Sequence, residues 1–92
     1  MLKKVIHFIC EFNNLCRNDN RISSWAVYIE KSILKIDINF INHNGSVYSY
    51  HTFIDIYKLQ CMKSDLKSFA IYLFTESQRT FESEQILGGD NK

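Results

Sequence analysis

Proline is absent from the sequence, and glycine occurs only three times in 92 residues. The glycines form neither a phosphate-binding loop nor a nucleophile elbow, so the common signatures of nucleotide-binding and hydrolytic enzymes are missing. No apolar run approaches the roughly 18 residues that a membrane-spanning helix requires. Because the sequence shows no recognisable element of a reactive site, we expect a protein that is not an enzyme.

The sequence also has no marked excess of positive or negative charge. Eleven Lys and Arg residues stand against ten Asp and Glu residues, which leaves a formal net charge of +1. The chain as a whole is therefore not attracted to nucleic acid or to anionic lipid. Any binding of that kind has to come from a local patch of charge.

Cysteine and histidine are few, with three of each. The cysteines form no CxxC pair, and no two histidines share the spacing of a metal pair. We therefore expect reduced thiols on apolar faces, no metal or other cofactor, and a cytoplasmic location. Glu11 interrupts the apolar N-terminal run, which argues against a signal peptide. The residues concerned are Cys10, Cys16, Cys61, His7, His43 and His51.

The N-terminal segment has the apolar spacing of a helix that buries one face. From Leu2 to Cys16 the apolar residues recur every three or four positions, which predicts a first helix. The polar stretch Arg17–Arg21 then breaks this period with residues that favour turns. We expect an exposed loop there.

A second helix is predicted near the C-terminus. It begins after Ser64, a suitable N-cap, and continues into the Ser77–Gln85 region. The pair Gly88 and Gly89 predicts the end of this helix. Residues 88–92 would then form a polar tail.

Between the two helices the apolar residues alternate with a period of two, which predicts strands. If Lys31 and Ser32 form a two-residue hairpin turn, the first two strands pair apolar residues on one face. The predicted pairs are Ile29 with Leu34, Val27 with Ile36, and Trp25 with Ile38.

A second turn is predicted at Asn44 and Gly45, because this dipeptide suits the positive φ angles of a type I′ hairpin. In the resulting register His51 is partly buried. The segment Ile54–Met62 fits either an extension of the third strand or a short helix. The predicted pairs across the second turn are Phe40 with Ser49, Ile38 with His51, and Ile36 with Phe53.

The order of elements predicts a single α+β domain over residues 1–92, arranged α-β-β-β-α. Its three strands form an antiparallel meander, and its two helices pack on one face of that sheet. We expect one core from both helices and the sheet. Its predicted members are Phe8, Phe12, Trp25, Val27, Ile36, Ile38, Phe69 and Leu73.

The face of the sheet opposite the helices is the first candidate binding surface. In the register above it carries Tyr28 opposite Lys35, Tyr50 opposite Asn39, and Tyr48 opposite Ile41. Tyrosine is enriched in interfaces because its ring buries a large area at little entropic cost. The alternative is that these tyrosines are present only as good strand formers.

The loop after the first helix is the second candidate. Its arginines and amides could bind a phosphate, a carboxylate or a protein backbone, and the alternative is an ordinary solvated loop. The residues are Asn14, Arg17, Asn18, Asn20 and Arg21. A third group comprises Lys58, Lys63 and Lys67, where a helix N-terminus could add to the attraction for phosphate.

The α-β-β-β-α order resembles that of double-stranded-RNA-binding domains, although the consecutive lysines of that family are absent from Lys63–Lys67. In size, lack of motifs and αβ make-up, the whole chain is also similar to small phage-encoded anti-CRISPR proteins, in particular inhibitors of the type I-F (Csy) surveillance complex. That family has no shared signature, so no residue roles follow. The resemblance implies an inhibitor that docks on Cas subunits and guide RNA in the host cytoplasm and blocks target DNA binding or nuclease recruitment.

We therefore predict a non-enzymatic binding protein with a protein partner, and an anti-CRISPR protein is the leading interpretation. The alternatives are a toxin-immunity or other regulatory protein and a small RNA- or DNA-binding module. No membrane partner is expected. The predicted contact residues are Asn14, Arg17, Asn18, Asn20, Arg21, Tyr28, Lys35, Tyr48 and Tyr50.

Overall fold

The structure is a computed structural model that describes the backbone of residues 3–90 and the side chains of residues 3–85. One helix, three antiparallel strands and two further helices follow each other along the chain, which confirms the predicted α+β class. The elements are α1 (Lys3–Arg17), β1 (Ile22–Glu30), β2 (Ile33–Ile41), β3 (Val47–Asp55), α2 (Ile56–Gln60) and α3 (Leu66–Asp90).

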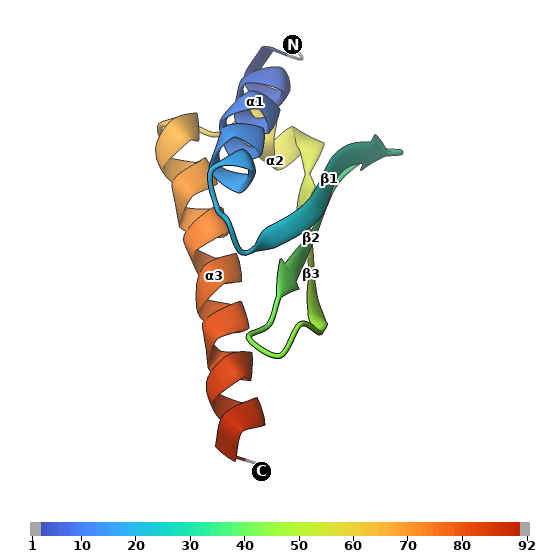
Figure 1. The fold of residues 1–92 in the computed structure, drawn as a ribbon. Coiled ribbons are helices and arrows are strands. Elements are labelled where there is room, and N and C mark those ends of the chain that lie inside the picture. The colour runs from blue at the N-terminus through green and yellow to red at the C-terminus, as the bar shows by residue number, and fades with distance from the viewer. Residues whose placement is uncertain (1–2, 91–92) are drawn as a thin grey trace.

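Helices α1 and α3 lie side by side on one face of the sheet, whose strand order is β1-β2-β3 (Figure 1). Aromatic rings join the two helices: the ring centroids of Phe8 and Phe69 are 5.7 Å apart, and those of Phe12 and Phe74 are 5.9 Å apart. No helix covers the opposite face within the part of the chain that the structure describes. The sheet therefore has one buried face and one open face.

Strand β2 supplies the centre of the core because it has a neighbour on each side. Its alternate residues Leu34, Ile36, Ile38 and Phe40 are fully buried under the helices. Of the eight predicted core residues, Phe8, Phe12, Ile36 and Ile38 are fully buried, and Trp25, Val27, Phe69 and Leu73 pack against them while partly exposed. The prediction of a single core is confirmed.

The segment Ile54–Met62, predicted to be either an extension of the third strand or a short helix, is first strand and then helix. Strand β3 continues to Asp55, whose side chain then caps α2 by accepting a hydrogen bond of 2.8 Å from the Tyr57 backbone nitrogen. A carboxylate at this position satisfies an N–H group that has no partner within the helix. The short helix α2 is thus started by the last residue of the strand.

Two predicted limits of the last helix are wrong. Its N-cap is Asp65 and not Ser64, because the Asp65 carboxylate accepts hydrogen bonds from the Lys67 backbone and the Ser68 hydroxyl. At the other end α3 continues through Gly88 and Gly89 to Asp90. Glycine lowers helix propensity without removing a hydrogen-bond donor, so it does not by itself end a helix.

The register between β1 and β2 is as predicted, with Trp25, Val27 and Ile29 opposite Ile38, Ile36 and Leu34. The turn between these strands consists of Lys31 and Ser32. Lys31 has a φ of 60°, in the left-handed region that favours glycine. The apolar pairing across the strands holds this turn in place despite the unfavourable residue.

The predicted register between β2 and β3 is wrong by one residue. Phe40 lies opposite Tyr48, Ile38 opposite Tyr50, and Ile36 opposite Thr52. Because side chains alternate along a strand, this shift exchanges the two faces of β3. His51, expected to be partly buried opposite Ile38, is exposed opposite Asp37.

The shape of the second turn explains the error. Gly45 donates to the Asn42 oxygen at 3.0 Å, and Asn42 donates to the Ser46 oxygen at 2.7 Å, so three residues form the loop. Gly45 has a φ of 89°, whereas among the described non-glycine residues only Lys31 has a positive φ. This is the pattern of a three-residue hairpin with glycine in the left-handed position, and not of the two-residue type I′ turn.

Candidate functional site

The open face of the sheet presents a row of three side chains, one from each strand. Lys35 on the central strand lies opposite Tyr28 on one side and Phe53 on the other. Phe53 is 72% exposed and Tyr28 is 41% exposed. We use the name outer face for Tyr28, Lys35, Phe53 and the next cross-strand pair, Asp37 and His51.

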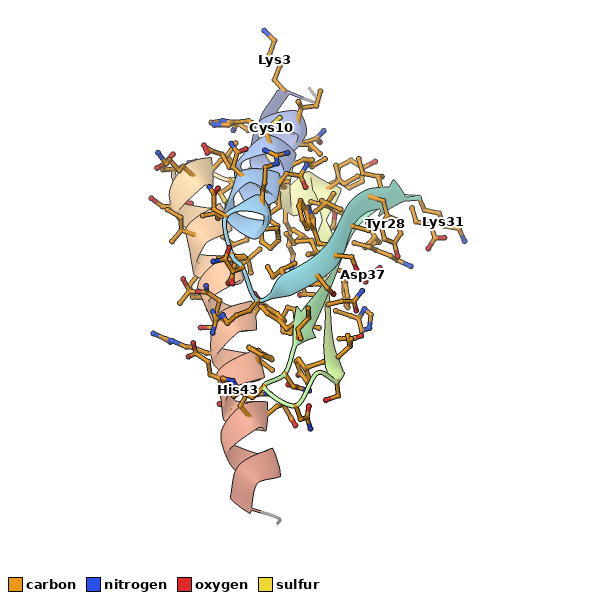
Figure 2. All side chains as sticks on the ribbon, in the orientation of Figure 1. Lys3, Cys10, Tyr28, Lys31, Asp37 and His43 are labelled. Atoms are coloured by element: carbon orange, nitrogen blue, oxygen red, sulfur yellow. The ribbon has the colours of Figure 1, made fainter. Side chains whose placement is uncertain are left out.

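Asp37 is the centre of a polar network beside this row. Its carboxylate lies 2.7 Å from His51 Nδ1 and also interacts with the Tyr28 hydroxyl. The hydrogen bond to His51 holds the pKa of Asp37 below its usual value, and the interaction with the Asp37 carboxylate raises the pKa of Tyr28. Figure 2 shows Tyr28 and Asp37 on the part of the sheet away from α1 and α3. These contacts fix the orientation of the polar groups.

Lys35 is paired on the same face. Its ammonium group forms an ion pair with Glu30, and this hydrogen bond raises the pKa of Lys35. Further along the sheet, Asn39 donates to the Ser24 hydroxyl at 2.9 Å and accepts from the Ser49 hydroxyl at 2.7 Å. These polar groups of the open face thus pair with one another, whereas Phe53 remains exposed beside them on the edge strand β3.

The histidine–aspartate pair does not form a cleft. The His51 side chain is 67% exposed, so the pair lies on an open surface where water competes for each group. Within the described residues no group of three His, Cys, Asp or Glu side chains is placed to hold a metal ion. The pair is therefore a solvent-exposed hydrogen bond on the surface of the sheet.

Tyr48 and Tyr50, predicted to be contact residues, do not belong to the outer face. Both are partly buried on the helix side of the sheet, packed against the core. The ring centroids of Tyr48 and Phe81 are 6.1 Å apart, and burial raises the pKa of Tyr48. The shifted register of β3 is the reason, and it places His51 and Phe53 on the face where the tyrosines were expected.

Arg21, predicted to lie in an exposed binding loop, is instead engaged within the protein. It forms ion pairs with Asp19 at 3.2 Å and with Glu82 at 3.1 Å, and its guanidinium carbon lies 5.5 Å from the centroid of the Phe81 ring. Gln78 also donates to Asp19 at 3.0 Å. These contacts fasten the loop to α3.

The other predicted loop residues remain at the surface. Arg17 donates to the Asn14 side-chain oxygen at 2.8 Å, and both residues are exposed. Asn18 and Asn20 are exposed and border an open hollow of about 500 Å³ between the loop and α3. This group lies at the end of α1 and is separate from the outer face.

The cysteines differ from one another in their surroundings. Cys16 is buried in the core, and burial raises its pKa to about 12. Cys10 and Cys61 are exposed, so the prediction that all three lie on apolar faces is wrong for these two. All three thiols are free of disulfide bonds.

The structure therefore unites Tyr28 and Lys35 of the predicted contact residues and adds Asp37, His51 and Phe53. Among the described helices, none is both long enough and apolar enough to span a membrane. Comparison with known proteins found no matching family model, no similar curated protein and no similar solved structure.

Proposed function

We propose that the chain is a non-enzymatic binding protein that recognises a protein partner through the outer face. The observation that carries this proposal is the exposure of Phe53, which is 72% accessible on the edge strand β3 although its side chain is large and apolar. Burying a phenylalanine side chain contributes about 1.5–3 kcal/mol. A partner that covers Phe53 recovers this stabilisation, which the fold itself leaves unused.

The surroundings of Phe53 match the anatomy of an interface. Tyr28 and the stem of Lys35 extend its apolar surface, and the Asp37–His51 pair provides hydrogen-bonding groups at its edge. Interfaces commonly combine exposed aromatic anchors with a polar rim of this kind. Because the Asp37 network is held in place before binding, little ordering is required when a partner docks.

The charges on this face favour a protein over a polyanion. Lys35 is paired with Glu30, and His51 with Asp37, so the face offers no excess of positive charge. A nucleic-acid surface would need uncompensated cations to bind phosphates. The mixed, paired charges instead suit the mixed polarity of a protein surface.

The specific partner in this proposal is the type I-F CRISPR surveillance complex. The chain would bind its Cas subunits and block target DNA binding or nuclease recruitment, as the resemblance to small anti-CRISPR proteins implies. A toxin-immunity or other regulatory role is the second candidate, since it would use the same exposed face. Purified complex tests the first role directly: target DNA binding, or cleavage of the bound DNA once the nuclease is added, should fall as the protein is added in stoichiometric amounts.

A pair of matched variants tests the outer face whatever the partner is. Phe53→Asp places a charge on the outer face, and Tyr72→Asp places the same charge at another exposed aromatic, on α3. Both side chains are largely exposed, so both variants should fold. The Phe53 variant should bind the partner at least about 10-fold more weakly, equivalent to about 1.4 kcal/mol, and the Tyr72 variant should bind normally.

The anti-CRISPR role and the use of the outer face can be disproved independently. Absence of binding to the purified surveillance complex would remove the anti-CRISPR role while leaving the outer face open to another protein. Proteins captured from a host lysate with equal yield by wild type and the Phe53 variant would exclude the outer face as the contact surface.

A further inference from the structure

Five lysines from separate parts of the sequence gather at one end of the molecule. The start of α1, the helix α2 and the start of α3 all lie at this end (Figure 1). Lys4 Nζ joins them directly, since it donates to the backbone oxygens of Gln60 and Met62 at 3.1 Å each, 56 and 58 residues away in the sequence. We call this region the basic end, and its lysines are Lys3, Lys4, Lys58, Lys63 and Lys67.

The lysines of the basic end are exposed and not neutralised. Arg21, Lys35 and Arg79 each form an ion pair with a carboxylate. None of the five lysines does so among the side chains that the structure describes. Lys4 binds only backbone oxygens, and Lys3 projects away from the rest of the molecule (Figure 2).

The nearby carboxylates are occupied in other ways. Asp55 caps α2, and Asp65 caps α3 by accepting from the Lys67 backbone nitrogen and the Ser68 hydroxyl. Glu11 borders the same hollow between α1 and α3 as Lys67, at the edge of the basic end. Asp55 and Asp65 are thus both engaged at helix N-termini, and no described carboxylate forms an ion pair with any of the five lysines. The near-neutral chain therefore has one end with a local excess of positive charge.

We propose that the basic end binds the phosphate backbone of a nucleic acid. A phosphate backbone carries regularly repeated negative charge, so exposed lysines spread over one end of the molecule can each meet a phosphate without a shaped pocket. This binding would be independent of base sequence, because lysine acts as a point charge and no base-reading groups are required. The basic end is distinct from the outer face and takes a different partner.

The packing of α1 argues against a membrane surface as the partner. A helix that lies in a lipid interface inserts its apolar face between the headgroups. The apolar stripe of α1, made of Val5, Phe8, Phe12 and Cys16, is already buried in the protein core. Ile6 is the one large apolar side chain that α1 exposes among the described residues, and a single residue does not form an apolar face that could insert.

Fluorescence anisotropy with labelled RNA and DNA duplexes, over a series of salt concentrations, tests the proposal. Both duplexes should bind at low salt, and the logarithm of the affinity should fall linearly with the logarithm of the salt concentration, with a slope of about −0.9 per phosphate contacted. Two other polyanions serve for comparison: polyglutamate, and vesicles that contain phosphatidylserine.

Two double variants of equal net charge distinguish the effect of the basic end from the effect of the overall charge. Lys63→Gln with Lys67→Gln removes two charges from the basic end, while the backbone N–H that bonds to Asp65 is retained. Arg17→Gln with Arg79→Gln removes two charges elsewhere. The lysine variant should bind both duplexes at least about 10-fold more weakly and reduce the salt slope by about two, whereas the arginine variant should preserve the slope.

Three results would overturn the proposal. These are no binding of either duplex at low salt, equal weakening by the two double variants, or binding of vesicles or polyglutamate at least as tight as binding of the duplexes. Phe53→Asp should leave duplex affinity unchanged. Failure at the basic end therefore leaves the proposed role of the outer face untouched.

Discussion

The Asp19 carboxylate accepts three hydrogen bonds from Arg21, at 2.9 Å from its backbone nitrogen and at 3.2 Å from each of two guanidinium nitrogens. Another guanidinium contact, to Glu82, reaches α3. The loop between α1 and β1 is therefore held by charged contacts to a helix that is distant in the sequence. Arg21 thus has a structural role before any partner is considered.

Replacement of Arg21 by alanine should destabilise the fold. Hydrogen bonds to charged groups contribute about 1.5–3 kcal/mol, and solvent screening at this partly exposed site reduces the expected loss to about 1–2 kcal/mol. Arg17→Ala is the matched control, since Arg17 is exposed and its change should stay within about 0.5 kcal/mol. Denaturant unfolding measures both, and equal effects would contradict the structural role of Arg21.

Asp19 should make stability depend on pH. Burial raises the pKa of Asp19, but hydrogen bonds from Arg21 and Gln78 outweigh this effect and hold its pKa below the ordinary value of 3.8. The stabilisation is therefore fully present above the unfolded-state pKa and is lost as the pH falls through the folded-state pKa. Asp19→Asn should lower stability at neutral pH and flatten its decline below about pH 4. Parallel pH profiles for wild type and variant would contradict this.

The register of β3 can be tested with two neighbouring residues. Tyr50 is partly buried on the core side, whereas His51 is exposed opposite Asp37. Tyr50→Ala should cost about 2 kcal/mol of unfolding free energy, because apolar area is lost from the core. His51→Ala removes a surface pair and should cost at most about 1 kcal/mol. If thermal or denaturant melts showed a larger loss of stability for His51→Ala than for Tyr50→Ala, they would instead support the register of a two-residue turn.

The three cysteine thiols should fall into two classes by their rate of reaction with a thiol reagent. Cys16 is buried and its pKa is raised to about 12, so little reactive thiolate forms in the folded protein. Cys10 and Cys61 are exposed and should react with a thiol reagent without unfolding. Titration should find two accessible thiols in the native state and a third in denaturant. A folded Cys16→Ala variant that has only one fast thiol would show that this assignment is wrong.

The sequence was sufficient for those parts of the fold that depend on local periodicity. The spacing of apolar residues identified α1 and most of α3, and the apolar pairs of Val27 with Ile36 and Trp25 with Ile38 set the first hairpin correctly. The second hairpin depended on the conformation of its turn. Asn44 and Gly45 are compatible with either a two-residue or a three-residue loop, and one residue of difference reverses the faces of β3.

The candidate surfaces were harder to predict because they depend on contacts between distant residues. Phe53 could have been assigned to the outer face only from the correct register. Arg21 appeared to be an ordinary loop arginine, since its partner Glu82 lies 61 residues further along the chain. Likewise, Lys58, Lys63 and Lys67 looked like a minor group until the fold brought the start of α1 beside them.

The packing of α1 against α3 has a consequence for how the protein is made. Helix α1 leaves the ribosome before α3, yet the rings that pack against Phe8 and Phe12 include Phe69 and Phe74 of α3. Until translation has passed these positions, Phe8 and Phe12 of the nascent helix lack these two aromatic partners. The hairpins can pair early, but the hydrophobic interior closes only when the last helix emerges. The unfinished domain is thus prone to aggregation until α3 has emerged, and chaperones can bind its exposed apolar side chains during that interval.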